Sequence, residues 1–246
     1  MTIDYHTGAN GHRIAYQHQP DDGVGVVFCG GYRSDMDSSK GAALAEWCAE
    51  RHIPLTRFDY FAHGASDGAF MEFTIGSAIE ATLEVLDHIA AREVIVVGSS
   101  MGGWVGLQVA LQRPLQVKAF VGIASAPDFT ERLMLQKLPT ALRAQLENEG
   151  VIYLPDFDDN EYPVTMHFIA EARRHLLLEH PIPLSIPVHL LHGQRDADVP
   201  WETSMLIAET LTGDDVAVEL VKDGDHRLNR PQDLRLLLDA VARLRG

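Results

Sequence analysis

Short runs of apolar, often β-branched residues alternate along the chain with longer segments that have a helical spacing of apolar positions. This alternation predicts an α/β fold, in which parallel strands are connected by helices. We expect strands at residues 14–18, 24–29, 55–59, 94–98, 118–123, 188–192 and 216–221. We expect helices at residues 39–51, 75–90, 101–113, 201–211 and 232–244. Such a chain forms a mostly parallel central sheet with helices on both faces.

Two segments interrupt this alternation. Near the N-terminus, residues 5–6 and the stretch GHRIAYQHQ predict an antiparallel hairpin that leads into the sheet. Residues 128–184 contain helical patterns at 130–149 and 164–180, separated by the Pro- and Asp-rich stretch LPDFDDNEYP. A parallel crossover needs only about a dozen residues. We therefore expect a single domain over residues 1–246, with a small inserted cap at about 128–184 over the carboxyl edge of the sheet.

Composition limits the class of partner. The 246 residues are 46% hydrophobic and 22% charged, which is enough for one large core. The longest apolar runs, such as EVIVVG, are far shorter than the roughly 18 residues of a membrane span, and the first residues do not resemble a targeting peptide. With 20 Lys and Arg against 35 Asp and Glu, the net charge of -15 disfavours binding to nucleic acids and anionic membranes. We therefore expect a cytoplasmic protein with small or neutral partners.

The pattern G-x-S-x-G occurs twice, as GASDG at residues 64–68 and as GSSMG at residues 98–102. A nucleophilic serine in this pattern needs a buried strand before it and a helix after it, because the serine sits on a sharp turn at the top of a sheet. Ser100 has this setting, between EVIVV and the apolar segment GWVGLQVALQRP. Ser66 is followed by Asp67-Gly68, which is typical of a turn. Ser100 is therefore the predicted nucleophile, and Ser66 is predicted to be a loop residue.

A nucleophilic serine needs a histidine base that is oriented by a carboxylate, and in a sheet of this kind the chain order is Ser, Asp or Glu, His. Asp196 follows the strand predicted at 188–192, and His226 follows the strand predicted at 216–221. Asp198 is a second candidate carboxylate. Because it lies nearer the following helix, we assign it instead to the start of that helix. No HExxH or clustered Cys and His pattern indicates a metal.

The reaction also needs two backbone N–H donors for the developing oxyanion. Met101 supplies one, because it directly follows the predicted nucleophile. Tyr32 is the predicted second donor, since Gly30-Gly31 before it allows close approach of the backbone. The alternative is that Gly30-Gly31 simply forms a turn at the end of a strand.

The motifs GGYRSDM, RFDYFAHGASDG, VGSSMGGW, LLHGQRDADVPW and GDHR follow one another within residues 24–238. In this order and spacing they resemble the α/β-hydrolase-domain acyl-protein thioesterases, in particular the palmitoyl-protein thioesterases. The resemblance implies the α/β-hydrolase fold, with Ser100 as nucleophile, Asp196 as orienting carboxylate and His226 as base. It also implies hydrolysis of acyl thioesters or esters without a cofactor. The expected substrates are small-molecule esters or acyl thioesters, with S-acylated proteins as a further candidate.

A large acyl group needs an apolar cleft, and the inserted segment offers candidate walls. These are Leu133, Met134, Leu138, Met166, Phe168 and Ile169. The same residues at helical spacing can equally form the packed face of the insertion. Carboxylesterase, lipase-like or peptidase activity is an alternative, because fold and triad do not define the substrate. A ligand-binding protein without catalytic activity would be expected to carry a damaged triad, and this sequence does not.

Overall fold

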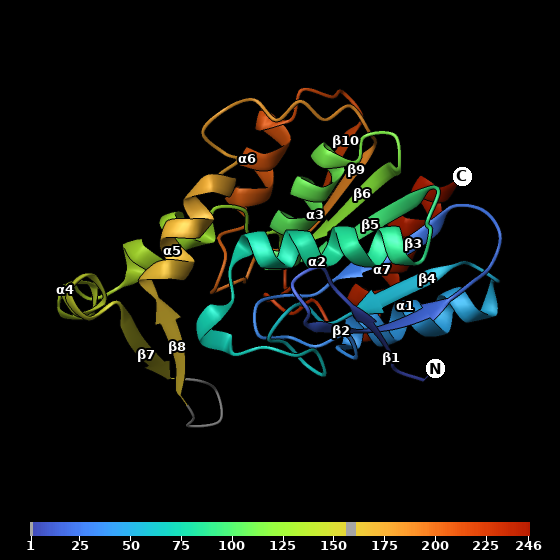
Figure 1. Ribbon diagram of the computed structural model, residues 1–246. Coiled ribbons are helices and arrows are strands. Elements are labelled where there is room, and N and C mark those ends of the chain that lie inside the picture. Colours follow the sequence, from blue (N-terminus) through green and yellow to red (C-terminus); the bar gives the residue numbers. More distant parts are fainter. Residues whose placement is uncertain (1, 156–160) are drawn as a thin grey trace.

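The computed structural model describes residues 2–155 and 161–246, and the described strands build one large sheet and one small one (Figure 1). The strands of the large sheet are β1 (Asp4–Thr7), β2 (Arg13–Gln19), β3 (Gly25–Cys29), β4 (Leu55–Phe58), β5 (Val94–Ser99), β6 (Val117–Ile123), β9 (Val188–Gly193) and β10 (Val216–Val221). Their order across the sheet is β1-β2-β4-β3-β5-β6-β9-β10. From β4 to β10 all neighbours are parallel, whereas β2 is antiparallel to both β1 and β4.

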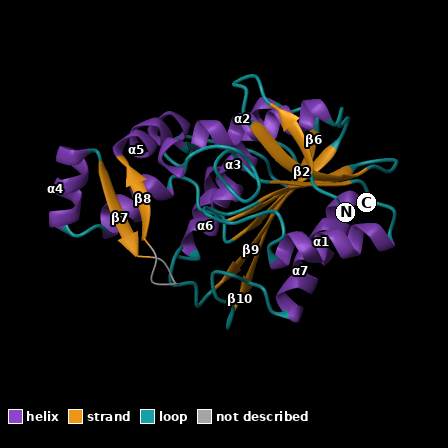
Figure 2. Cartoon of the chain, turned by 60° about the horizontal axis from the view of Figure 1, so that its bottom comes forward, coloured by secondary structure: helices purple, strands orange, loops and turns teal. Residues whose placement is uncertain are grey.

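Helices cover both faces of the large sheet. One face carries α1 (Ser39–Glu50) and α7 (Pro231–Arg245), and the other carries α2 (Ile75–His88), α3 (Met101–Gln112) and α6 (Glu202–Thr210) (Figure 2). Side chains of a strand point alternately to its two faces. Along β5, Val94 and Val96 therefore join the core beneath α2 and α3, while Ile95 and Val97 join the core beneath α1 and α7. The central strands are buried on both sides, as their continuous apolar runs predict.

The predicted α/β class, with its mostly parallel sheet, is confirmed. The strand predicted at 216–221 coincides with β10, and the helix predicted at 101–113 agrees with α3 to within one residue. The predicted N-terminal hairpin is present as β1 and β2, which pair antiparallel. Among the described residues, no helix is both long and apolar enough to cross a membrane.

The inserted segment differs from its prediction. Its elements are η2 (Thr130–Leu135), α4 (Thr140–Glu149), β7 (Val151–Pro155), β8 (Glu161–Thr165), α5 (Met166–Ala172) and η3 (Arg173–His175). Figures 1 and 2 show that α4, α5, β7 and β8 lie together to one side of the large sheet. The helix predicted at 130–149 is interrupted at Pro139, which has no N–H for a helical hydrogen bond.

The helix predicted at 164–180 is also wrong in its extent. Residues up to Thr165 belong to β8, and α5 starts only where the Thr165 hydroxyl accepts a hydrogen bond from the Phe168 N–H at 3.0 Å. β8 pairs antiparallel with β7, so the two strands form a hairpin that helical periodicity did not indicate. Of the Pro- and Asp-rich stretch between them, residues 156–160 lie outside the described residues.

Candidate active site

Ser100 occupies the sharp turn between β5 and α3. Its backbone angles are φ 54° and ψ -119°, a left-handed conformation that is costly for a residue other than glycine. The motif glycines make room for this turn. A Cβ atom at Gly98 would lie 2.3 Å from the carbonyl oxygen of Gly102, and one at Gly102 would lie 2.1 Å from the carbonyl oxygen of Cys29. The local geometry is that of a strained turn which presents a serine above the end of a strand.

His226 and Asp196 come to Ser100 from two other strand ends. Asp196 lies in the loop after β9, and His226 lies in the loop after β10. The His226 Nε2 is 3.1 Å from the Ser100 Oγ, and the His226 Nδ1 is 2.7 Å from the Asp196 Oδ2. The carboxylate of Asp196 is fully buried, whereas the His226 side chain is 23% exposed. The structure thus brings the three predicted residues together, with the imidazole at the edge that solvent can reach.

Both oxygens of Asp196 are engaged. Oδ1 accepts hydrogen bonds from the backbone N–H groups of Asp198 at 2.9 Å and Val199 at 2.8 Å, and Oδ2 lies 3.1 Å from the His192 Nε2 as well as 2.7 Å from His226. Burial alone would raise the pKa of Asp196. The hydrogen bonds from His192, His226 and Val199 outweigh burial and hold that pKa well below its ordinary value. Asp196 is therefore ionised at neutral pH.

His192 is a partner of the site that the sequence did not assign. Its side chain is fully buried. Its Nε2 faces two acceptors, the Asp196 Oδ2 and the Val199 carbonyl oxygen, each at 3.1 Å, so this nitrogen carries a proton. Its Nδ1 lies 2.7 Å from the Ser204 hydroxyl. His192 thereby holds Asp196 through the same oxygen, Oδ2, that faces His226. Its position four residues before Asp196 is the signal that could have indicated this contact.

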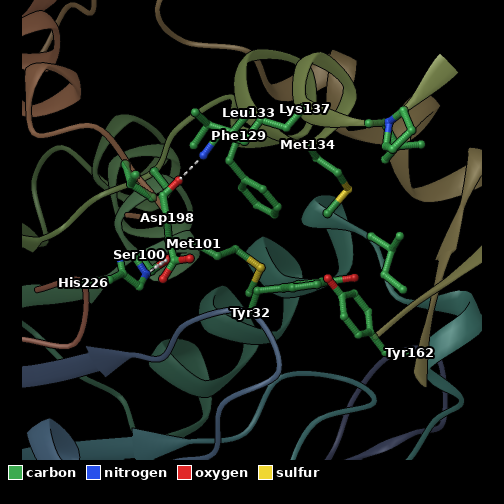
Figure 3. A pocket seen from close by; sticks show the side chains of 15 residues that line it. Tyr32, Ser100, Met101, Phe129, Leu133, Met134, Lys137, Tyr162, Asp198 and His226 are labelled. Carbon is green, nitrogen blue, oxygen red and sulfur yellow. Dashed lines mark hydrogen bonds between the residues drawn. The ribbon is translucent and has the colours of Figure 1, made fainter. Parts of the chain in front are cut away.

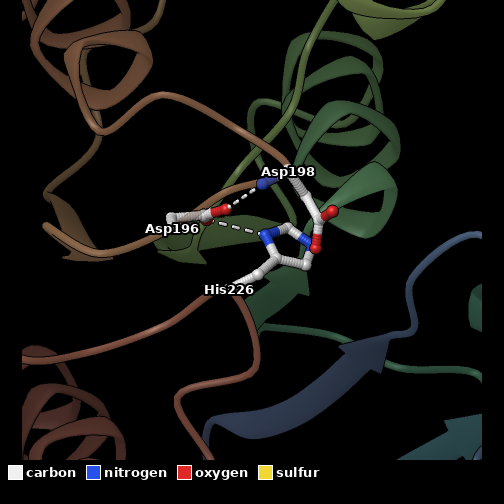
Figure 4. Close-up of side chains that lie close together, drawn as sticks. All are labelled: Asp196, Asp198 and His226. Carbon is white, nitrogen blue, oxygen red and sulfur yellow. Dashed lines mark hydrogen bonds and ion pairs between the residues drawn. The ribbon is translucent and has the colours of Figure 1, made fainter.

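Asp198 does not have the predicted role at the start of the next helix. The helix α6 begins at Glu202, its N-cap residue is Trp201, and no side chain caps it. Instead, the Asp198 carboxylate lies beside His226 and Asp196, with ligand-type atoms of all three within 4.8 Å of one another (Figure 4). A carboxylate has about four acceptor positions, and those of Asp196 are occupied by the N–H groups described above. Hydrogen bonding within the protein therefore accounts for the position of Asp196 without a metal ion.

The predicted oxyanion donors, Tyr32 and Met101, flank Ser100. The loop that carries Tyr32 follows β3, and a Cβ atom at Gly31 would lie 3.6 Å from the Ser100 Cβ. Met101 is the first residue of α3. In the described part of the chain, no acceptor is found for the backbone N–H of Tyr32 or Met101. Both N–H groups therefore lie on segments next to Ser100 and have no backbone acceptor among the described residues.

The loop after β3 is held by residues of the loop after β4. The Arg33 N–H donates to the His63 Nε2 at 3.1 Å, and the Met36 N–H donates to the Asp59 Oδ1 at 2.7 Å. The His63 Nδ1 lies 3.1 Å from the Phe61 carbonyl oxygen and so carries the ring proton. Burial lowers the pKa of His63 to about 4, so the ring is neutral at pH 7. No sequence motif indicates this role for His63, because nothing local links it to the loop of Gly30-Gly31.

Ser66 has a different environment from Ser100. Its hydroxyl donates to the Asp59 carbonyl oxygen at 2.7 Å and accepts from the Ala15 N–H at 2.8 Å. These bonds connect the end of β4 to β2, and the described contacts place no histidine nitrogen at its Oγ. Ser66 thus lies in a loop, as its surrounding sequence predicted.

An elongated cavity of about 410 Å³ opens onto Ser100 and His226 (Figure 3). Of the predicted wall residues, Leu133, Met134 and Leu138 line it. Met166, Phe168 and Ile169 do not, because α5 turns these side chains into the core; Phe168 and Ile169 are buried there. The prediction for those three residues was therefore wrong.

Further residues that line the cavity were not predicted to be its walls, although Tyr32 and Met101 were predicted as oxyanion donors. These lining residues include Tyr32, Met101, Ala126, Phe129, Pro139, Leu154, Tyr162 and Val199. In Figure 3, Phe129 and Met134 point into the space that separates Tyr162 from Ser100. The Lys137 ammonium donates to the Asp198 carbonyl oxygen at 3.0 Å, which ties the inserted segment to the loop of Asp196. These residues come from segments distant in sequence, so no local pattern could have grouped them.

Comparison with known proteins identifies relatives over nearly the whole chain. Residues 26–239 match the family model described as "Alpha/beta hydrolase family". The chain is 39% identical over 230 residues to the human "Palmitoyl-protein thioesterase ABHD10, mitochondrial", covering 93% of this chain and 75% of that protein. Two solved structures are similar at 35% identity. Mouse alpha/beta hydrolase domain-containing protein 10 has a TM-score of 0.91 over 99% of this chain and 98% of that one, and a putative hydrolase from Agrobacterium vitis S4 has a TM-score of 0.93 over the full length of both.

These relatives correct the predicted location. The curated thioesterases from human, Pongo abelii and rat are all named as mitochondrial, which contradicts the expectation of a cytoplasmic protein. That expectation rested on composition and on the first residues of the chain. Neither property determines the compartment in which a folded hydrolase works.

Proposed function

The chain belongs to the alpha/beta hydrolase family and is an ester or thioester hydrolase, and from this premise we propose that Ser100, His226 and Asp196 form its catalytic triad. The observation that carries the proposal is the continuous hydrogen-bonded path from the Ser100 Oγ through His226 to the buried Asp196. A serine hydroxyl becomes a nucleophile when a histidine can take its proton, and the carboxylate holds that histidine in the required tautomer. The low pKa of Asp196 keeps this carboxylate charged during the reaction.

The proposed reaction has two steps. Ser100 attacks the acyl carbonyl while His226 takes its proton, and the oxyanion is held by the N–H groups of Tyr32 and Met101. His226 then returns the proton to the leaving group, and an acyl-serine remains. In the second step His226 activates a water molecule that releases the free acid. Asp196 orients His226 throughout.

The substrate we propose is an acyl thioester with a long apolar acyl group, as an acyl-protein thioesterase would take. The cavity beside Ser100 supports this choice, because its walls are largely apolar and it opens directly at the nucleophile. The relatives named as palmitoyl-protein thioesterases support the same class. In this proposal the insertion at about 128–184 is a cap, since Leu133 and Tyr162 supply walls of the acyl cavity.

A substrate panel tests the acyl preference. Hydrolysis of p-nitrophenyl esters and of acyl thioesters from two to sixteen carbons would be measured by kcat/KM for the purified protein, and we expect the value to rise with chain length. Replacement of the wall residue Met134 by Trp should reduce kcat/KM for long chains more than for short ones, because the side chain fills the cavity. A constant preference for short oxygen esters would instead favour the alternative function, a carboxylesterase of small esters.

Two serine variants test the nucleophile. Ser100→Ala should lose both turnover and labelling by a fluorophosphonate probe, because the attacking oxygen is gone. Ser66→Ala is the matched control, since it removes a hydroxyl from the same five-residue pattern and should keep its labelling. Normal turnover in Ser100→Ala would overturn the proposed triad. A wild-type protein that neither labels nor hydrolyses any substrate would point to a ligand-binding role.

A further inference from the structure

A second cavity, of about 670 Å³, also opens at Ser100. It shares Tyr32, Ser100 and His226 with the apolar cavity, and in the described part of the chain the two have no other lining residue in common. A carbonyl carbon bound at Ser100 can therefore extend its acyl chain into one cavity and its leaving group into the other. The leaving atom must lie near His226, which returns the proton to it. We call this second cavity the leaving-group cavity. Next to His226 it is lined by Arg227 and Asn229, which follow His226 in the chain.

The lining of the leaving-group cavity differs in charge from the rest of the protein. The chain has 35 acidic and 20 basic residues. Yet among the described residues, the lining includes the basic Arg33, Lys40 and Arg227 and no acidic side chain. Its other polar side chains are those of Tyr32, Ser34, Ser38, Ser39, Ser99, Ser100, His226 and Asn229. A concave surface of one sign focuses the local potential and attracts ligands of the opposite sign, even on a protein of net negative charge.

Lys40 and Arg227 are close enough to influence each other. Burial is the main reason that the pKa of Lys40 is lowered to about 8; the positive charge of Arg227 also lowers it, whereas Asp225 and Asp233 raise it. Neither aspartate is part of the lining. The Oδ1 of Asp225 accepts the backbone N–H groups of Arg227 and Leu228 at 3.1 and 3.0 Å. A bound anion between the two cations would relieve their mutual repulsion.

Hydroxyl and cationic groups in this combination suit a phosphate better than a single carboxylate. Phosphate oxygens accept several charge-assisted hydrogen bonds at once, and arginine and lysine are their usual donors. Ser38 and Ser39 stand at the start of α1, where no side chain caps the helix, so its first N–H groups add further donors. The Arg33 guanidinium carbon lies 4.0 Å from the centroid of the Tyr162 ring. Lys40 and Arg227 both line the cavity and are close enough to influence each other, so they are the cations to test.

We propose that the leaving-group cavity binds a phosphate-bearing thiol, so that the protein hydrolyses acyl thioesters of such thiols. The inference rests on the proposed function, since it uses Ser100 as nucleophile. In the reaction the bond from the Ser100 Oγ to the acyl carbon forms and the carbon–sulfur bond breaks. The Ser100 proton passes through His226 to the thiolate sulfur, which leaves as the thiol. Water then cleaves the acyl-serine to the free acid.

The experiment compares thioesters that share one acyl group and one type of bond. Initial rates would be measured for acyl-coenzyme A and for acyl-pantetheine, which has the same thiol end but no phosphate. We expect kcat/KM to be roughly tenfold or more higher for acyl-coenzyme A, mainly through KM, because hydrogen bonds to charged groups are the strong ones. The ratio of the two values should fall as salt concentration rises.

Charge variants locate the effect. In the double variant Lys40→Gln with Arg227→Gln, the ratio should fall to within about threefold of unity. Lys118→Gln is the control for the loss of a positive charge elsewhere, because it removes one from an exposed ion pair with Glu93 at the start of β6, away from the carboxyl edge. It should keep the wild-type ratio. Coenzyme A alone should also inhibit p-nitrophenyl ester hydrolysis competitively in the wild type, and only weakly in the double variant.

The outcomes separate this inference from the proposed function. Equal rates with both thioesters and no inhibition by coenzyme A would overturn the phosphate site and leave the thioesterase intact. If the ratio of kcat/KM for the two thioesters stayed at its wild-type value in the double variant, the assignment to Lys40 and Arg227 would also be overturned. Failure to hydrolyse either thioester, with no labelling of Ser100, would overturn both.

Discussion

Two loops of this protein carry the same five-residue pattern and use it in different ways. At GSSMG, the serine occupies a left-handed turn between a buried strand and a helix, and its hydroxyl faces His226. At GASDG, the hydroxyl of Ser66 bonds to the backbone of Ala15 and Asp59. The first serine is free to change its bonding partner, whereas the second holds two strands together. The pattern therefore defines a tight turn, and the chemistry depends on what the fold places opposite the hydroxyl.

The segment before GASDG also contacts the loop after β3, which lies beside Ser100. His63, directly before the GASDG motif, binds the Arg33 N–H, and Arg33 follows the proposed oxyanion donor Tyr32. The segment that leads into GASDG thus holds the loop of Tyr32 in place. We therefore expect substitutions in and next to GASDG to affect stability and positioning. Substitutions at Ser100 and its partners should affect the chemistry.

The largest effect is expected at Asp196, the carboxylate that is hydrogen-bonded to His226. Asp196→Asn should reduce kcat by about 10⁴-fold, the size found when the carboxylate of a Ser-His-Asp triad is neutralised. The matched control is Asp198→Asn, which should change kcat/KM by less than about tenfold, because the described hydrogen bonds of the His226 ring go to Asp196 and Ser100. Both would be measured with one p-nitrophenyl ester. A greater loss for Asp198→Asn would reverse the assignment of the two aspartates.

Acid should destabilise the fold through His63, directly before the GASDG motif. The pKa of His63 is about 4 in the folded protein, against an ordinary value of about 6.5. Between these values the unfolded chain binds a proton that the folded protein does not, so the free energy of unfolding falls as pH falls from about 6.5 to 4. The His63 contribution to this loss is on the order of 3 kcal/mol. Urea unfolding at pH 7 and pH 4.5 should show a smaller loss for His63→Gln than for wild type; an identical loss would exclude His63 as the cause.

The same histidine should affect catalysis without touching the substrate. His63→Ala removes the acceptor of the Arg33 N–H and should lower kcat roughly 10- to 100-fold with little change in KM, because Tyr32 is less well positioned. His63→Gln offers an amide oxygen as a replacement acceptor and should recover part of kcat. Equal kcat values for all three proteins would show that the loop after β3 does not need this contact.

The smallest effect is expected at Ser66. Ser66→Ala leaves the Ala15 N–H without its acceptor and should lower the free energy of unfolding by about 1–2 kcal/mol. Its kcat should stay within about twofold of wild type, because the hydroxyl bonds only to backbone groups in the described contacts. Thermal unfolding followed by circular dichroism, together with ester kinetics, would check both. A kcat loss without a stability loss would contradict the structural role.

Much of the fold and the core of the candidate site could be predicted because their signals are local. The run from Val94 to Gly102 shows a strand, a tight turn and a helix in adjacent residues, and Asp196 and His226 each follow a recognisable strand. The inserted segment was predicted less well. The hairpin of β7 and β8 is stabilised by pairing between strands and was not predicted; apart from residues 164–165, it lies between the two predicted helices.

The sequence by itself predicted the order of the strands along the chain, the strand-turn-helix setting of Ser100 that Ser66 lacks, and the two side chains, Asp196 and His226, that the fold brings to Ser100. Only the tertiary structure decided that His192 holds Asp196, that His63 holds the loop of Tyr32, and that Phe168 packs into the core while Phe129 lines the cavity. It also placed Lys40 beside Arg227, 187 positions apart in the chain. Periodicity and turn chemistry act over a few neighbouring residues, whereas these contacts depend on how distant strand ends and loops pack against one another.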